Sequence, residues 1–318
     1  MKRSYLFAAI ALPLLAACSS GEKSLTDYVN PFIGTGGHGH TYPGAVVPHG
    51  LVQLSPDTRL ADWDACSGYY YEDKSLLGFS QTHLSGTGIG DYGDFLFLPY
   101  TGTEPKKVAP NGRDRFESYG SHFSHQDEVA KPGYYEVKLS DYGIKAELTA
   151  SKHAGFQQYT FPKAETAGLL IDLRSSISYR RLLEGSFHLH GDTAVSGTRH
   201  VRGWAQNRYA SFYAVFSKPF TFKEDTFHRG FFSFGPMKAG EQLKVKVGIS
   251  FVDEAGAQRN LYAEIPGWNF KAVRQAAHQA WEQELAKIQV KDKSEENKRI
   301  FYTAIYHSLL EPTVDSDV

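Results

Sequence analysis

Residues 62–68, with the sequence DWDACSG, contain the side chains best suited to recognising a small polar ligand. Trp63 offers a flat apolar face on which a sugar ring can stack, and its indole N–H donates one hydrogen bond. Asp64 can accept two hydroxyl bonds. The alternative is that Trp63 covers one end of the fold and that Asp64 makes a turn bond. We interpret Cys66 as a small residue that lines the binding site and not as a nucleophile, because no base that could activate its thiol is evident in the sequence.

A second candidate segment, residues 82–88, has the sequence THLSGTG and predicts a shaped loop. His83 could bond a ligand hydroxyl, or it could be a core histidine satisfied by backbone groups, and the sequence leaves both interpretations open. Asp91 and Asp94 follow as the pattern DYGD, which could bind calcium or act in acid–base chemistry. An Asp in a glycine turn is far commoner, so we expect a structural role for this pair.

The GGHGH run at residues 36–40 is the pattern that most invites a metal interpretation. Two histidines that lie two residues apart on an extended segment point to opposite faces, and no third ligand is near in the sequence. Cys18 and Cys66 are the two cysteines of the chain, which excludes a cysteine-rich zinc site. We therefore expect no metal ligands here.

The elements that position these residues are mostly short strands. Mixed apolar and polar segments, separated by turn signals, predict strands over residues 134–139, 144–150, 154–161, 186–190, 201–204, 209–216 and 243–252. The continuous apolar run GLLIDL at 168–173 predicts a strand buried on both faces. Strands at this spacing without intervening helices predict an antiparallel β-sandwich. The glycine-dense residues 30–100 predict long functional loops.

The period of the apolar residues changes after residue 267. Positions three or four apart predict one buried helix face: Phe270, Val273, Ala277, Trp281, Leu285 and Ile288. Ser294 predicts the N-cap of a further helix. Residues 300–310 are apolar on most sides, and such a helix needs partners on all sides. We expect that residues from about 294 begin a helical domain that this chain does not contain.

The first residues form a targeting segment. Lys2 and Arg3 precede an apolar run at 6–15 that is too short to span a bilayer, which is typical of a secretory signal. The run ends LAAC and resembles a bacterial lipobox, in which Cys18 is acylated; the alternative is an ordinary signal peptide cleaved near Ala17. Ser19 in place of Asp favours the outer membrane, so we expect an exported, lipid-anchored outer-membrane protein on its periplasmic or surface side.

The charge balance restricts the partners. Lys and Arg number 34 and Asp and Glu number 35, so the chain lacks the basic excess that binding to nucleic-acid phosphates requires. We therefore expect no nucleic-acid partner. Apolar residues make up 41% of the 318 residues, which is enough to fill a sizeable core.

Three long, compositionally unusual stretches show a family resemblance. They are YVNPFIGTGGHGHTYPGA at 28–45, WDACSGYYY at 63–71 and GFSQTHLSGTGIGDYGD at 78–94. Together they resemble the N-terminal domain of glycoside hydrolase family 92, a family of bacterial α-mannosidases. Residues 301–318 resemble the opening of the family's helical catalytic domain. One departure is Gln81, where the family pattern has His.

The resemblance implies an N-terminal β-sandwich, a helical linker and an (α/α)6 toroid, of which this chain contains only the first helix. It also implies calcium-dependent, inverting hydrolysis of terminal α-mannosides, with the catalytic acid, base and calcium ligands in the toroid, past Val318. The family's pocket loops match Trp63, Asp64 and Cys66, and the resemblance adds His83 and Asp317 as further substrate-binding candidates. The expected partner is a mannose-containing glycan.

These expectations give a domain division: a lipoprotein signal peptide at 1–18, a tether at 19–24, a β-sandwich at 25–265, a helical linker at 266–291 and the start of a truncated catalytic domain at 292–318. They also predict an exo-α-mannosidase fragment that is inactive alone. The alternative function is a non-catalytic carbohydrate-binding lipoprotein.

Overall fold

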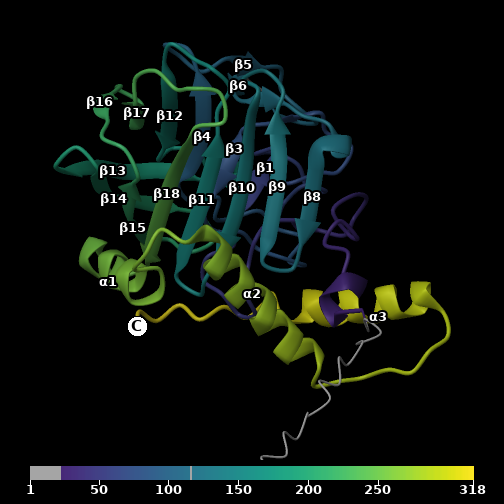
Figure 1. The fold of residues 1–318 in the computed structure, drawn as a ribbon. Helices are drawn as coiled ribbons and strands as arrows, with labels where there is room; N and C mark the ends of the chain where they lie inside the picture. The colour runs from purple at the N-terminus through teal and green to yellow at the C-terminus, as the bar shows by residue number, and fades with distance from the viewer. Residues whose placement is uncertain (1–22, 115–116) are drawn as a thin grey trace, which may run out of the picture.

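A computed structural model describes residues 23–114 and 117–318, so the predicted signal peptide and Cys18 lie outside the described residues. Two antiparallel sheets form its body, seen as two layers in Figure 1. In order across the sheet, the eight-stranded sheet contains β13 (Arg181–His190), β14 (Ala194–Arg202), β15 (Arg208–Phe216), β18 (Gln242–Ser250), β11 (Ala154–Thr160), β10 (Ile144–Ala150), β9 (Tyr134–Leu139) and β8 (Glu128–Lys131).

The six-stranded sheet contains, in order across the sheet, β1 (Ser55–Asp57), β3 (Gly78–Ser80), β4 (Leu96–Thr101), β12 (Ala167–Asp172), β17 (Arg229–Ser233) and β16 (Thr221–Glu224). Two small pairs lie beside it: β2 (Ser75–Leu76) with β7 (Ser121–His122), and β5 (Lys107–Val108) with β6 (Ser118–Tyr119). The short 3-10 helices are η1 (Leu25–Tyr28), η2 (His125–Asp127) and η3 (Ile177–Tyr179).

Aromatic side chains join the two sheets. Phe97 of β4 meets Phe212 of β15 edge-on, with 6.4 Å between ring centroids. Phe79 of β3 stacks on Tyr159 of β11, also at 6.4 Å. Both pairs belong to one hydrophobic core that extends through the two layers. The predicted antiparallel β-sandwich is therefore confirmed, and β12, the GLLIDL strand, is buried along its whole length, as predicted.

Three α-helices follow the last strand: α1 (Glu254–Glu264), α2 (Phe270–Leu285) and α3 (Glu295–Ser308). Helix α1 was not predicted, because its sequence lacks a clear apolar stripe. It packs on β18 where Gly248 leaves room, since a Cβ at that position would lie 2.1 Å from the Ala257 carbonyl oxygen. Figure 1 shows α1 and α2 across one end of the eight-stranded sheet, with α3 beside η1.

Helices α2 and α3 match their predicted positions. The predicted face of α2 is buried at Phe270, Ala277, Trp281 and Leu285. The prediction was wrong for Ile288, which lies beyond the end of α2 and is 57% exposed. Ser294 caps α3, since its hydroxyl accepts the Asn297 N–H at 3.2 Å.

Helix α3 buries one face. The described residues do not pack against its other sides, although the apolar sequence predicted packing all round. Tyr302 and Tyr306 pack into a cluster with Trp281, whereas Ile300 is 58% exposed among the described residues. No helix within the described part of the chain has both the length and the hydropathy needed to cross a membrane.

Candidate functional site

The predicted site residues lie on three neighbouring loops, which we call loop A (residues 34–42), loop B (59–71) and loop C (82–94). Loop B follows β1, and loop C connects β3 to β4, so two adjacent strand pairs of the six-stranded sheet bring these segments together. Loop A precedes β1 and contacts both of the others through the hydrogen bonds described next.

Hydrogen bonds fix the three loops to one another. The Gly86 N–H of loop C donates to the His40 carbonyl of loop A at 2.7 Å. The Ser67 hydroxyl of loop B donates to the Thr41 carbonyl at 3.0 Å, and the Thr41 and Ser85 hydroxyls lie 3.0 Å apart. Because buried polar groups of the loop backbone are paired in this way, the loops form a shaped surface.

Trp63 is the exposed aromatic side chain of this surface. Its side chain is 53% exposed, and the His40 ring lies edge-on to it at 4.3 Å between centroids. The His38 ring lies 5.1 Å away on the same indole. Gly88 of loop C, with a φ of +63°, approaches both His40 and Trp63, and a Cβ there would lie 3.4 Å from the imidazole of His40. Trp63 is therefore supported by loops A and C and leaves half of its surface free for a ligand.

Asp64 and Cys66 lie on the same turn of loop B as Trp63. The Asp64 carboxylate is partly exposed and accepts a 2.5 Å hydrogen bond from His38 Nδ1. Cys66 is 1% exposed, and burial raises the pKa of its thiol even though Gly88 and Thr87 bond to it. A thiol held protonated is a poor nucleophile, so the structure favours the predicted wall role.

His83 lies beneath the loops. Its side chain is fully buried; Nδ1 is 2.6 Å from the Gln53 carbonyl, and Nε2 is 2.9 Å from Asp57 Oδ1 and 3.1 Å from Ser80 Oγ. Both ring nitrogens therefore have protein partners. Of the two interpretations that the sequence left open, this geometry favours the core histidine, which supports loop C from below.

Asp91 and Asp94 bind arginines. Asp94 accepts two hydrogen bonds from Arg208 at 2.6 and 3.0 Å, and the buried Arg199 lies 3.3 Å away. Burial alone would raise the pKa of Asp94, but the two guanidinium groups outweigh it and lower this pKa to about 2. Asp91 accepts the Trp204 N–H at 2.6 Å. This agrees with the structural role expected for the pair, which attaches loop C to the eight-stranded sheet.

Glu311, three residues after the end of α3, was not predicted as a site residue from the sequence. Burial raises the pKa of this carboxyl to about 7, although the Ser85 backbone bonds to it. Its Oε1 is buried without a hydrogen-bond partner among the described residues, as are the hydroxyls of Tyr42 and Tyr306. The only sequence signal was an acidic residue at the end of an apolar run. A carboxyl that is half protonated near neutral pH can both donate to and accept from a hydroxyl group.

Asp317 lies at the far end of the C-terminal segment. Its carboxylate accepts from the Ser250 hydroxyl at 2.9 Å and from the Asn260 amide at 2.8 Å. Loops A to C make none of its hydrogen bonds among the described residues. Asp315 lies nearer to them, since its charge raises the pKa of Glu311 and of Tyr92 in loop C.

The described residues contain no cluster of metal ligands. No three His, Cys, Asp or Glu side chains in residues 23–114 and 117–318 gather in a way that could hold a metal ion. The nearest carboxylates in loop C are already bonded to arginines or to backbone, as described above. This part of the chain alone does not fit a calcium ion, which needs six to eight oxygen ligands.

Comparison with known proteins identifies the family. The model of the glycosyl hydrolase family 92 N-terminal domain matches residues 28–250, and that of the family 92 catalytic domain matches residues 256–318. A secreted, uncharacterised glycosidase of Arthroderma benhamiae is 30% identical over 92% of this chain and 42% of its own length.

Solved structures of family 92 enzymes are also similar to this chain. A family 92 α-mannosidase of Bacteroides thetaiotaomicron is 37% identical, with a TM-score of 0.87 over 94% of this chain and 43% of that one. The same α-mannosidase has been solved in complex with mannoimidazole, and this second structure gives a TM-score of 0.85 at 38% identity over 93% of this chain and 41% of that one. A family 92 inverting mannosidase of the same species is 27% identical, with a TM-score of 0.77 over 92% of this chain and 41% of that one.

The chain thus spans about two fifths of the length of these relatives. It nevertheless aligns with them over nearly all of its own residues. Because the N-terminal-domain model alone covers well over half of the chain, the protein belongs to glycosyl hydrolase family 92.

Proposed function

We propose that this chain forms one side of the substrate pocket of an inverting exo-acting α-mannosidase that hydrolyses terminal α-mannosides of glycans. The observation that supports the proposal is the half-exposed Trp63, held between His40 and Gly88 on three mutually bonded loops. Structural relatives at 27% to 38% identity are mannosidases, and one of them binds mannoimidazole. A neutral sugar needs what these loops offer, namely an aromatic face and hydroxyl-bonding groups.

The proposed roles follow from position. Trp63 packs against a face of the sugar ring, and Asp64 accepts bonds from its hydroxyl groups. Cys66 forms the wall behind them, and His83 holds loop C in place from below. Glu311 is an additional hydroxyl partner, because its carboxyl group is bonded to the Ser85 backbone of loop C and one of its oxygens has no partner among the described residues. We keep Asp317 as a candidate for more remote contacts.

The proposal places the catalytic step outside this chain. Inversion needs a carboxylic acid and a carboxylate about 6.5–9.5 Å apart with a water between them. In loop C, Asp94 is neutralised by arginines, and in loop B Asp64 is bonded to His38. We infer that the acid, the base and the calcium ligands belong to the part of the relatives' length that this chain does not span, and that the 318 residues alone are inactive.

We also propose a location and a domain division for this chain. The relative from Arthroderma benhamiae is described as secreted, which supports export of this chain. Lipid attachment at Cys18 and an outer-membrane position remain proposals from the sequence. We further propose a division into a sandwich at 25–265, a linker at 266–291 and the start of a catalytic domain at 292–318. The family's catalytic-domain model begins its match earlier, at residue 256.

Two measurements test the proposal. Purified residues 19–318 should release no mannose from α-mannosides in the presence of calcium, and mannose release would contradict the inference that they lack the acid–base pair. In a full-length enzyme that continues past residue 318, Trp63→Ala should lower kcat/KM about tenfold or more, because exposed tryptophans at binding sites contribute strongly to affinity.

Trp204→Ala is the matched control. Trp204 is 65% exposed, so the same truncation is made on a tryptophan outside loops A to C. Its kcat/KM should stay near that of the wild type. A wild-type rate for Trp63→Ala, or loss of its fold by circular dichroism, would exclude the pocket role.

A further inference from the structure

A second cavity lies on the outer face of the six-stranded sheet. Strand pairing places Leu96 of β4 and Arg229 of β17 on either side of Asp172 of β12, so the three side chains form a row on one face. Phe97 and Ile171, one position away on their strands, point into the sandwich core instead. The row forms the floor of a cavity of about 630 Å³, a size in the range of small-molecule sites. Segment 174–182 and the β5–β6 pair form its walls.

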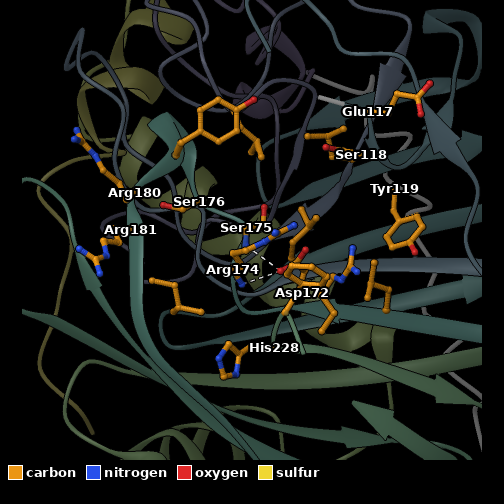
Figure 2. A pocket seen from close by; sticks show the side chains of 18 of the residues that line it. Glu117, Ser118, Tyr119, Asp172, Arg174, Ser175, Ser176, Arg180, Arg181 and His228 are labelled. Atoms are coloured by element: carbon orange, nitrogen blue, oxygen red, sulfur yellow. Dashed lines mark hydrogen bonds between the residues drawn. The ribbon is translucent and has the colours of Figure 1, made fainter. Parts of the chain in front are cut away.

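The lining is strongly cationic. Five basic residues line the cavity, and two acidic ones do: Lys107, Arg174, Arg180, Arg181 and Arg229 against Glu117 and Asp172. The chain as a whole has a formal net charge of −1, so the excess of basic over acidic residues in this lining is a local feature. Figure 2 shows Arg174, Ser175 and Asp172 together, with Arg180 and Arg181 to one side and Tyr119 to the other.

Aromatic rings hold two of these guanidinium groups. Phe227 is 51% exposed, and the guanidinium carbons of Arg174 and Arg229 lie 5.2 and 5.1 Å from its ring centroid. Arg229 lies 5.0 Å from the Tyr119 ring as well, and its Nε donates to Asp225 at 2.7 Å. The guanidinium of Arg174 makes no hydrogen bond or ion pair with any described residue. It is therefore oriented by a ring and free to bind an anion.

Ser175 follows Arg174 in the lining of the cavity. It is 7% exposed, and its hydroxyl is buried without a hydrogen-bond partner among the described residues. Its backbone position is fixed, because Asp172 Oδ1 accepts the N–H groups of Arg174 and Ser175 at 2.8 and 3.1 Å. Asp172 therefore fixes the backbone from which the Arg174 side chain extends.

We propose that this cavity binds an anionic sugar, that is, a saccharide unit bearing a carboxylate, sulfate or phosphate group. The Arg174 guanidinium binds the charged oxygens, and the Phe227 ring packs against the sugar. The volume exceeds what an inorganic ion fills, and the exposed ring offers an apolar surface that such an ion cannot use. None of Trp63, Asp64, Cys66, Glu311 or Asp317 lines the cavity, so this binding is independent of the mannosidase proposal.

The test is calorimetric titration of residues 19–318 with glucuronic acid, mannose 6-phosphate, inorganic phosphate and mannose. Glucuronic acid or mannose 6-phosphate should bind at least tenfold more tightly than inorganic phosphate, and the tighter of the two identifies the charged group. The absence of binding by both at millimolar concentration would overturn the proposal. Inorganic phosphate binding as tightly as the phosphosugar would overturn the sugar assignment.

Paired variants test the sign of the charge effect. Arg174→Met should weaken binding about tenfold, since it removes a charged donor but keeps a long side chain over Phe227. Asp172→Asn should tighten binding severalfold, because the amide oxygen still accepts both backbone N–H groups while the negative charge is lost.

Arg299→Met on the exposed surface of α3 is the control for Arg174→Met and should leave binding unchanged. Trp63→Ala should also leave it unchanged, which separates this cavity from the mannoside site. The opposite pattern, in which Asp172→Asn weakens and Arg174→Met tightens binding, would identify a cation site and overturn the proposal. Melting temperatures establish that each variant is folded before it is titrated.

Discussion

The two candidate binding regions are built on different principles. Loops A to C place Trp63 and Asp64 on irregular backbone, and their shape depends on left-handed residues such as Gly88. The cavity on the six-stranded sheet places Asp172 and Arg229 on paired strands, where alternation decides which side chain faces outward. The loop site presents an aromatic face and a carboxylate that is bonded to His38, whereas the cavity has more basic than acidic side chains in its lining and includes Arg174, whose guanidinium has no hydrogen bond to a described residue. The first therefore suits a neutral sugar and the second an anionic one.

The largest expected effect concerns the ion pairs that attach the loop site to the sandwich. Asp94→Ala leaves Arg199 fully buried without its carboxylate, and breaking such a pair costs about 3–5 kcal/mol of folding stability. Asp192→Ala, at an exposed position, should cost less than about 0.5 kcal/mol. Urea denaturation of both variants measures the difference.

The same carboxylate has a pH dependence of known sign. The pKa of Asp94 is lowered from 3.8 to about 2 in the folded protein, so its contribution is present above pH 3.8 and is lost as the pH falls toward 2. If Asp94→Ala lowered the free energy of unfolding equally at pH 7 and at pH 2.5, this account of how Asp94 attaches loop C would be wrong.

The next effect tests the buried carboxyl beside the loops. The pKa of Glu311 is raised from 4.5 to about 7, so ionising it costs stability as the pH rises from 4.5 to 7, and above pH 7 the full cost applies. Glu311→Gln removes that cost and should raise stability by up to about 3 kcal/mol at pH 8, with little change at pH 4. Thermal melts at the two pH values check this, and a pH-independent difference would show that Glu311 is not buried as described.

A smaller effect distinguishes the two regions directly. Raising the salt concentration from 50 to 500 mM should weaken binding of an anionic sugar to the Arg174 cavity severalfold, because the attraction is between charges near the surface. Binding of a mannoside at the loop site of the full-length enzyme should change by less than twofold. Salt titration by calorimetry measures both, and equal salt sensitivity would remove the contrast between the regions.

The smallest stability effect is expected for Asp64→Asn. The Asp64–His38 pair is partly exposed, with 73% of the histidine side chain accessible, so its loss should cost less than about 1 kcal/mol. In the full-length enzyme the same variant should lower kcat/KM severalfold, although the protein remains folded. A variant with normal kcat/KM would remove Asp64 from the proposed pocket.

Much of the architecture could be predicted because it depends on local patterns. The apolar run of β12 and the buried face of α2 follow from residue spacing that any window of the sequence shows. The strand expected at residues 201–204 is instead the end of the longer β14, whose polar and small residues obscured its start. Helix α1 was missed for the related reason that burial against Gly248, not amphipathicity, holds it in place.

The site was less predictable, since the environment of a polar atom depends on segments far apart in the chain. Nothing near His83 in the sequence indicates that Gln53 and Asp57 take both of its ring nitrogens. The half-buried Glu311 is bonded to the backbone of Ser85, more than two hundred residues earlier in the chain. Family resemblance supplied Trp63 and Asp64, but only the fold shows that the indole is exposed and held by His40.

The sequence by itself determined the family, the β-rich class and the helix faces, because these depend on motifs and on short-range periodicity. Tertiary structure decided how charges are paired: Asp94 bonds directly to Arg208 and lies 3.3 Å from Arg199, whereas Arg174 makes no close ion pair with a described residue, although the charge of Asp172 acts on it. The physical reason is that burial and charge pairing depend on distances in space, which sequence separation does not encode.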